Sequence, residues 1–129
     1  RVTVTGVVKR AQIPAVLPAF DIALQPAVVE YASPLKLFEY LYVGLPIVAP
    51  NTANICEILS HGETGLLFCL DDTNSFTDAI QTLVGDPLLR KRLSRNARNL
   101  VMKRNFTWHG NASEIASLAA RQRARGFGR

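Results

Sequence analysis

Short apolar runs alternate along the chain with longer stretches in which apolar residues recur at helical spacing. The apolar runs are bounded by prolines or turn residues, and they predict short buried strands at 21–25, 46–49 and 66–68. Alternating β-branched residues at 2–5, followed by Gly6, predict a further strand. Because strands separated by helices favour parallel βαβ units, we expect an α/β fold with an open parallel sheet and flanking helices.

The strongest helix start lies at Ser33 and Pro34, because serine is a favoured N-cap and proline a favoured first helical residue. Apolar residues then recur on one face of this helix, and Gly44 ends it. The face comprises Leu35, Phe38, Leu41 and Tyr42. The other expected helices cover residues 11–20 (short or broken at Pro18), 55–59, 75–84, 87–103 and 108–121, followed by a frayed end.

Two polar groups before and within the helix expected at 75–84 receive structural interpretations. Asp71 and Asp72 precede the helix, so capping explains them better than a metal site does. Ser75 and Asp78 have the spacing of a capping box. No Gly-x-Gly-x-x-Gly or P-loop motif is present, which disfavours a nicotinamide-dependent enzyme and an NTPase, and we expect no cofactor.

The histidines, the tryptophan and the cysteines also receive structural interpretations. His61 and His109 have no nucleophile or carboxylate partner at a recognisable spacing, so we expect both to be structural. Trp108 is interpreted as a core anchor. Cys56 and Cys69 lack a Cys-x-x-Cys spacing and are expected to be buried, reduced thiols.

Charge is distributed unevenly along this chain of 129 residues, whose 48% hydrophobic content is that of one globular domain. Residues 1–89 hold four Lys/Arg against nine Asp/Glu, whereas residues 90–129 hold eleven Lys/Arg against Glu114 alone. Such a basic region contacts nucleic acid, an anionic membrane surface or an acidic partner domain, or it forms a solvated helix face. The first residues, RVTVTG, lack an initiator methionine, and we expect a fragment of a longer protein.

A lysine and a glutamate stand near the start of the helix that follows Ser33. The N-terminal end of a helix offers unpaired N–H groups and a partial positive charge, which together favour an anion. Lys36 in the first turn is therefore suited to a bound phosphate, and Glu39 to hydrogen bonds from vicinal hydroxyls. The alternative is a solvated Lys36–Glu39 salt bridge, and the spacing alone favours it.

Several motifs, in the same order along the chain, resemble glycosyltransferase family 4, the retaining GT-B enzymes that use nucleotide-diphosphate sugars. The motifs are VTVTGVV, FDIALQP, SPLKLFEYLYVGLPIVA, ICEILSHGETGLLF, DPLLRKRLSRNAR and FTWHGNASEI. The third motif resembles the donor-binding signature of the family. The resemblance extends over about residues 2–118 and implies the Rossmann-like C-terminal half of a GT-B enzyme, truncated at its N-terminal strands.

The resemblance implies a donor site. By it, backbone and side-chain groups of four consecutive residues hold the diphosphate, and Lys36 is also the catalytic residue that stabilises charge on the leaving group. These residues are Ser33, Pro34, Leu35 and Lys36. Glu39 corresponds to the second glutamate of the family's E-x7-E motif, which binds the ribose hydroxyls.

The sequence departs from that motif at its first glutamate. Tyr31 stands there, and the nearest carboxylate, Glu30, is one residue out of register. The loop after Gly6, with Val7, Val8 and Lys9, matches the region of the family's nucleobase contacts. No protein-bound metal is implied.

The resemblance also implies how the domain is used. Residues 1–120 are expected to be a partial donor domain and residues 121–129 a basic tail, within a longer cytoplasmic glycosyltransferase that transfers a hexosyl group with retention. The acceptor (a glycan, lipid or small molecule) would bind an N-terminal domain outside this chain, and the chain alone would be inactive. Peripheral membrane contact through the basic C-terminal helices stays open, and no nucleic-acid partner is expected.

Two alternatives remain. One is a GT-B relative such as a nucleotide-sugar epimerase, for which no acid/base residues can be identified in this sequence. The other is a non-enzymatic module whose basic helices bind other macromolecules. Saturable binding of a nucleoside diphosphate would favour the glycosyltransferase.

Overall fold

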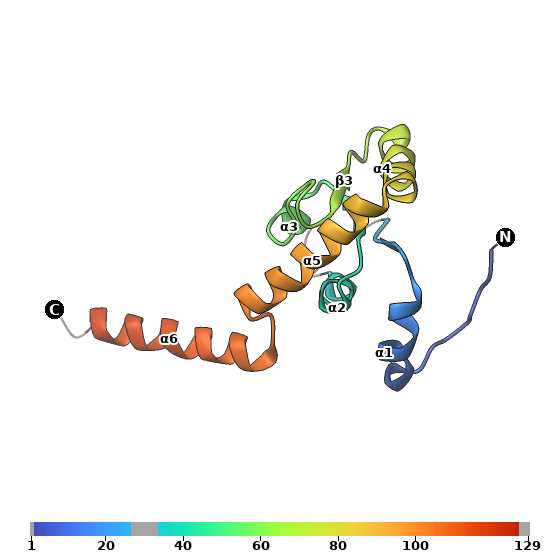
Figure 1. Cartoon of the computed structure of the whole chain (residues 1–129). Coiled ribbons are helices and arrows are strands. Elements are labelled where there is room, and N and C mark those ends of the chain that lie inside the picture. The colour runs from blue at the N-terminus through green and yellow to red at the C-terminus, as the bar shows by residue number, and fades with distance from the viewer. Residues whose placement is uncertain (1, 27–33, 127–129) are drawn as a thin grey trace.

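The structure, a computed structural model, describes residues 2–26 and 34–126. Its strands form a single parallel sheet in the order β1–β2–β3, and helices surround this sheet (Figure 1). The strand bounds are β1 Ala23–Leu24, β2 Ile47–Pro50 and β3 Leu66–Phe68. In register, Ala23 lies opposite Ile47, and Val48 lies opposite Leu66. The predicted open parallel α/β sheet is therefore confirmed.

The helices follow the predicted order with shifted ends. Their bounds are η1 Arg10–Gln12, α1 Ile13–Val16, η2 Leu17–Ala19, α2 Leu35–Val43, α3 Ala53–Cys56, α4 Thr73–Gly85, α5 Pro87–Arg104 and α6 Trp108–Gly126. The helix expected at 11–20 is broken into three short pieces, and Pro18 lies in the last of them. Since proline has no N–H to donate, it interrupts the hydrogen-bond ladder of a continuous helix.

The core has two layers, one on each face of the sheet. In β2, Ile47 and Ala49 point to one face and Val48 to the other, as strand alternation requires, and all three are fully buried. The first face packs against α2, α3 and the C-terminal half of α5, whereas the second packs against α4.

Helix α5 belongs to both layers. Leu93 is fully buried among residues of α4 and β3, while Ala97 and Val101, one and two turns later, are buried against α2. The periodic apolar face predicted for residues 87–103 is thereby confirmed. Asp86 begins the helix by accepting a hydrogen bond from the Leu89 amide at 2.8 Å.

The expected strand at 2–5 is wrong. Val2 and Val4 are 91% and 88% exposed, and the segment is extended chain with no partner among the described residues. A strand is stable only when a neighbouring strand pairs with its backbone groups. Gly6 has a φ of +69°, in the left-handed region, but no turn is formed there.

The buried face of α2 also differs from the prediction. Leu37 and Leu41 are fully buried, whereas Leu35 and Tyr42 are 73% and 75% exposed. Leu37 and Leu41 are four residues apart, so they form a stripe that is rotated from the expected one. Gly44 ends α2 with a φ of +80°, as predicted.

Helix α4 starts earlier than the capping-box interpretation requires. Asp72 is its N-cap and accepts a hydrogen bond from the Asn74 amide at 2.9 Å. Ser75 lies inside the helix, and its hydroxyl accepts from the Cys69 amide at 2.9 Å, so the capping box with Asp78 is wrong. Capping by Asp72 is confirmed.

Both cysteines are exposed thiols, which corrects the expectation that they are buried. Cys56 follows the fully buried Ile55 in α3 and points away from the core, where its thiol donates to Asn51 Oδ1 at 3.0 Å. Cys69 follows the buried Phe68 at the end of β3. In both cases the preceding residue points into the core, so the cysteine side chain points toward solvent.

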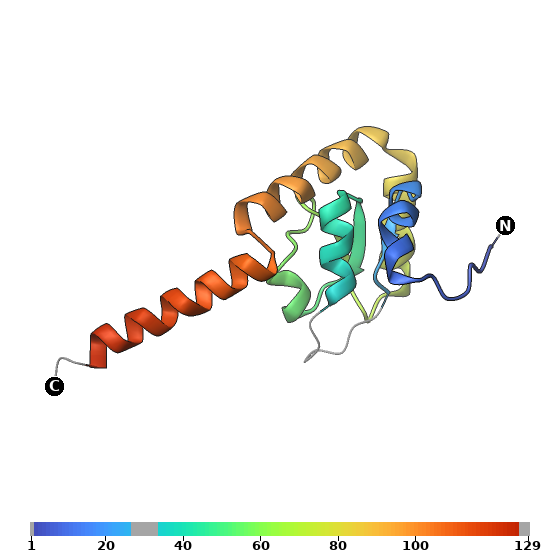
Figure 2. The same ribbon diagram turned by 90° about the horizontal axis from the view of Figure 1, so that it is seen from below.

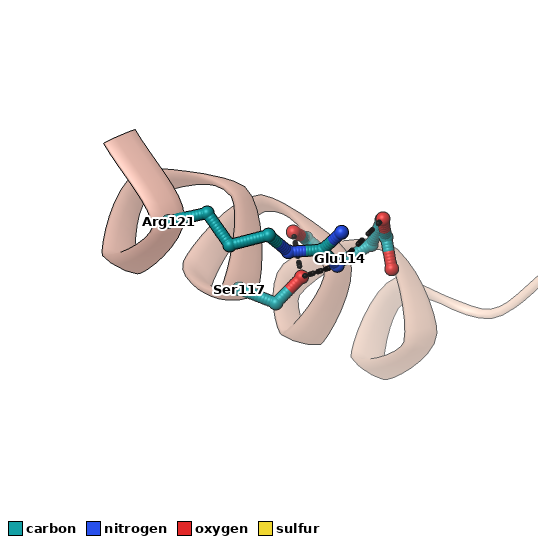
Figure 3. A network of polar contacts seen from close by, with 3 residues as sticks. All are labelled: Glu114, Ser117 and Arg121. Carbon is teal, nitrogen blue, oxygen red and sulfur yellow. Dashed lines mark hydrogen bonds and ion pairs between the residues drawn. The ribbon is translucent and has the colours of Figure 1, made fainter. Parts of the chain in front are cut away.

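Helix α6 extends away from the rest of the molecule (Figure 2). It continues to Gly126, beyond the end expected at residue 121. Arg121 forms an ion pair with Glu114 at 3.9 Å and donates to Ser117 Oγ at 3.2 Å (Figure 3). Both charged side chains are about two-thirds exposed, so this pair contributes little. No helix in the described part of the chain is long and apolar enough to cross a membrane.

Candidate functional site

The N-terminal end of α2 lies at the carboxyl edge of the sheet. The chain leaves β1 at this edge and re-enters the described structure at Pro34, which is buried and occupies the N-cap position. Pro34 is therefore one residue before the helix, not its first residue as predicted. A proline side chain cannot accept a capping hydrogen bond, so no side chain of the described residues is seen to cap this helix end. Ligands of open α/β sheets bind at this kind of position.

Lys36 and Glu39 are both exposed in the first half of α2. They do not pair with each other, because Glu114–Arg121 is the only ion pair among the described residues. The solvated salt bridge that spacing alone favours is therefore not formed. Both side chains are available to other groups.

Glu39 also lines a groove of about 890 Å³ between the N-terminal helical segment, α2 and α5. The floor and walls of the groove are mostly apolar, and three charged side chains lie along it. The apolar lining includes Ile13, Leu17, Phe38, Tyr42, Val101 and Met102, and the charged side chains are Arg10, Glu39 and Arg98. Glu39 thus lines the same groove as Arg10, the residue that follows the predicted nucleobase loop.

The predicted nucleobase loop is an open segment before η1. Val7 is 99% exposed and Val8 is half-buried. Lys9 takes the N-cap position of η1, and its amide donates to Gln12 Oε1 at 3.1 Å. That hydrogen bond belongs to the start of η1.

Glu39 influences a neighbouring phenol. Burial raises the pKa of Tyr40 above the ordinary tyrosine value of 10.0, and the negative charge of Glu39 raises this pKa further. The Tyr40 side chain packs partly against the core. Tyr40 is therefore a neutral group beside the candidate site at physiological pH.

Some predicted site residues lie outside the described part of the chain. They are Glu30, Tyr31 and Ser33. The side chain of Trp108, the expected core anchor, is also outside it.

Basic side chains of α5 have an unexpected use, because several donate to backbone carbonyls of other elements. Arg90 binds the carbonyls of Leu83 and Val84, and Arg98 binds that of Val43. The remaining basic donors are Arg92 to Gly62 and Arg104 to Glu57, at 3.3 and 3.0 Å, and the neutral Asn96 donates to Glu63 at 2.8 Å. These bonds place cationic groups at the C-terminal ends of α4, α2 and α3, where unpaired carbonyls favour positive charge.

Sequence reasoning missed this use of the basic residues. The acceptors are main-chain oxygens, which have no side-chain signature in the sequence. Some of the basic residues of 90–129 therefore hold elements of the molecule together, while their side chains stay exposed.

The other candidate residues have structural surroundings. His61 Nδ1 accepts a hydrogen bond from the Leu67 amide at 3.0 Å, which confirms its structural role. His109 is exposed in the first turn of α6. In residues 2–26 and 34–126, no three His, Cys, Asp or Glu side chains gather closely enough to hold a metal ion.

Comparison with known proteins gives a family match over about two-thirds of the chain. The family described as "Glycosyl transferases group 1" matches residues 1–86. The chain is 28% identical over 100 residues to alpha-D-kanosaminyltransferase from Streptomyces kanamyceticus, covering 78% of the chain and 26% of that protein. It is 30% identical over 108 residues to D-inositol 3-phosphate glycosyltransferase from Corynebacterium glutamicum (strain R), covering 84% of the chain and 25% of that protein.

The fold of this chain is similar to parts of larger proteins whose structures have been solved. Sucrose-phosphate synthase from Thermosynechococcus elongatus has a TM-score of 0.81 and 26% identity, over 97% of this chain and 31% of its own. Anabaena HepE, solved in complex with UDP and glucose, has a TM-score of 0.75 and 22% identity, over 86% of this chain and 30% of its own. The chain spans about a quarter of the length of the curated relatives named above.

Proposed function

Because the chain belongs to the family Glycosyl transferases group 1, we propose that it forms the nucleotide-sugar donor domain of a retaining glycosyltransferase of family 4. One observation carries the proposal: the N-terminal end of α2 lies at the carboxyl edge of a parallel sheet, with Lys36 and Glu39 exposed and unpaired with each other. The UDP complex of HepE supports a nucleoside diphosphate as the ligand class.

Lys36 and the end of α2 act on the leaving group. In the proposed transfer of a hexosyl group, the bond between the anomeric carbon and the diphosphate oxygen breaks, and a bond forms from that carbon to the oxygen of an acceptor hydroxyl, whose proton passes to the released diphosphate. Negative charge then accumulates on the diphosphate. The helix dipole and the Lys36 ammonium group stabilise this charge in a fixed arrangement, so the transition state is favoured more than the bound donor.

Other groups hold the nucleoside and the sugar. Glu39 accepts hydrogen bonds from the ribose hydroxyls, and Val7, Val8 and Lys9 contact the nucleobase. The common groove of Glu39 and Arg10 supports this assignment, since Arg10 directly follows Lys9. The diphosphate site also includes Ser33, Pro34 and Leu35. Glu30 or Tyr31 contacts the sugar that is transferred from the donor.

The chain acts within a longer cytoplasmic protein. Its short coverage of the relatives supports an acceptor site in another domain, for a glycan, a lipid or a small molecule. The chain alone is then inactive in transfer, and detectable turnover of a nucleotide sugar by the chain alone would contradict this. The exposed basic residues of α5 and α6 allow peripheral contact with an anionic membrane.

Calorimetric titration of the 129-residue chain with UDP, GDP and ADP tests the donor site. We expect saturable binding of at least one diphosphate, weaker binding of its monophosphate, and a preference for the ribonucleotide over its 2′-deoxy analogue. Lys36→Ala should weaken diphosphate binding about 30-fold, because a charged hydrogen bond contributes about 2 kcal/mol. Glu39→Ala should abolish the preference for the ribonucleotide.

Lys91→Ala is the matched control, since it removes an exposed lysine from α5, far along the chain from α2. The affinity of this variant for the diphosphate should equal that of the wild type. The donor-site assignment is wrong if no diphosphate binds, or if neither Lys36→Ala nor Glu39→Ala changes the affinity.

A further inference from the structure

Arg98 holds the C-terminal end of α2. Its Nε and Nη2 atoms donate to the carbonyl oxygen of Val43, the last residue of the helix, at 3.2 and 3.0 Å. The stem of Arg98 passes over Gly44, so closely that a Cβ at residue 44 would lie 2.8 Å from Arg98 Cγ. A glycine at this position therefore leaves room for the arginine.

This contact supplies a charge that α2 lacks. The last turn of α2 contains no basic residue, although the free carbonyls at a helix C-terminus favour a cation. Arg98 of α5, which is 55 positions later in the sequence than Val43, provides that cation. The same side chain lines the groove that contains Glu39.

We infer that Arg98 is a positioning residue for the donor site, an inference that rests on the function proposed above because Lys36 and Glu39 belong to α2. The helix has nine residues. It is therefore about 13 Å long, so that a tilt of roughly 5° at its fixed end would move its first turn by about 1 Å. A displacement of this size at a binding or reacting group is enough to weaken its contacts strongly.

Arg90 provides an internal control on the same helix. It also donates to carbonyls at a helix end, those of Leu83 and Val84 in α4. Helix α4 contains none of the proposed donor-site residues. If Arg98 only stabilises the fold, losing Arg90 and losing Arg98 should have equal effects on the diphosphate affinity. If Arg98 positions α2, only its loss should weaken diphosphate binding.

The test compares Arg98→Met with Arg90→Met in the 129-residue chain, well below the unfolding midpoint of each variant. Both should unfold at lower urea concentration than the wild type. The Kd for UDP, or for whichever of UDP, GDP and ADP the wild type binds most tightly, should rise about 10-fold or more in Arg98→Met and stay within about twofold of wild type in Arg90→Met. Arg98→Lys should recover part of the affinity, because an ammonium group can donate one of the two hydrogen bonds. If Arg98→Met does not fold, the intermediate affinity expected of Arg98→Lys becomes the test.

Backbone amide NMR provides a readout that does not depend on the ligand. Loss of the Arg98 contact should shift the Leu35, Lys36 and Leu37 amide resonances, and Arg90→Met should leave them in place. Unchanged affinity of Arg98→Met for that diphosphate, equal weakening in Arg90→Met, or unshifted amides in both would overturn the inference. Failure of the wild type to bind UDP, GDP or ADP, with the amide shifts present, would count against the donor site and not against the positioning of α2.

Discussion

Gly44→Ala tests the contact between α2 and α5 through its effect on stability. Residue 44 has a φ of +80°, which costs a residue with a side chain about 1–2 kcal/mol. The new methyl group would also meet the Arg98 side chain, with Cγ at 2.8 Å and Cδ at 3.0 Å. Arg98 must then move away and lose its hydrogen bonds to Val43, a further loss of about 1–3 kcal/mol. The expected total is about 2–5 kcal/mol.

Gly62→Ala separates the two contributions. Gly62 has a similar φ of +74°, but a Cβ there would meet nothing within 4 Å. Its substitution should therefore cost only the conformational part, about 1–2 kcal/mol. Equilibrium urea unfolding, followed by circular dichroism, gives both values from the shift in midpoint.

A double-mutant cycle with Arg98→Met completes the test. In the absence of the arginine, Gly44→Ala should lose the steric part and cost about as much as Gly62→Ala. The coupling between positions 44 and 98 should then be about 1–3 kcal/mol. The reasoning is refuted if Gly44→Ala costs no more than Gly62→Ala in the wild type, or if the cycle shows no coupling.

Three further predictions follow from burial and exposure. Because the pKa of Tyr40 is raised in the folded chain, its contribution to stability is complete below the unfolded value of 10.0 and is lost as the pH rises through the folded value. Urea unfolding at pH values on both sides of this range should therefore show a smaller alkaline loss in Tyr40→Phe than in the wild type, and an equal loss would contradict it. Cys56 and Cys69 should both react with an aromatic disulfide reagent without denaturant, whereas a reaction that requires unfolding would contradict their exposure. Leu93→Ala should cost about 2–5 kcal/mol in urea unfolding, because Leu93 is fully buried, and a cost below about 1 kcal/mol would contradict its place in the core.

The sequence predicts those elements whose signals are local. The apolar run before Pro50 has proline at both ends, and it forms the fully buried strand β2. Gly44 and Asp72 act at helix ends as their residue types predict. For these residues, backbone preference and the surrounding fold agree.

The wrong predictions concern features that depend on distant partners. The segment 2–5 has strong β propensity, yet propensity does not supply a neighbouring strand. In α2, two overlapping apolar stripes compete, and contact with α5 and the sheet selects the one that contains Leu37 and Leu41. Pairing of Arg98 with a main-chain oxygen far away in the sequence is not encoded by any local pattern.

The same limits apply to the candidate site. Lys36 and Glu39 stand out because charge at a helix start is a local property. Their common environment with Arg10 and Arg98 could not be predicted, since it depends on how three helical segments meet around the groove. Resemblance to a family indicates which residues to examine, and only the fold indicates what holds them in place.

Helix α5 has a consequence for the order in which this chain folds during synthesis. Leu93 completes the layer that contains α4, and Ala97 and Val101 complete the layer that contains α2, so both layers need residues that leave the ribosome late. The sheet and its earlier helices would then remain loosely packed until α5 emerges, with apolar surface open to chaperones. Both layers should consolidate in one cooperative step, after the translation of about residue 101.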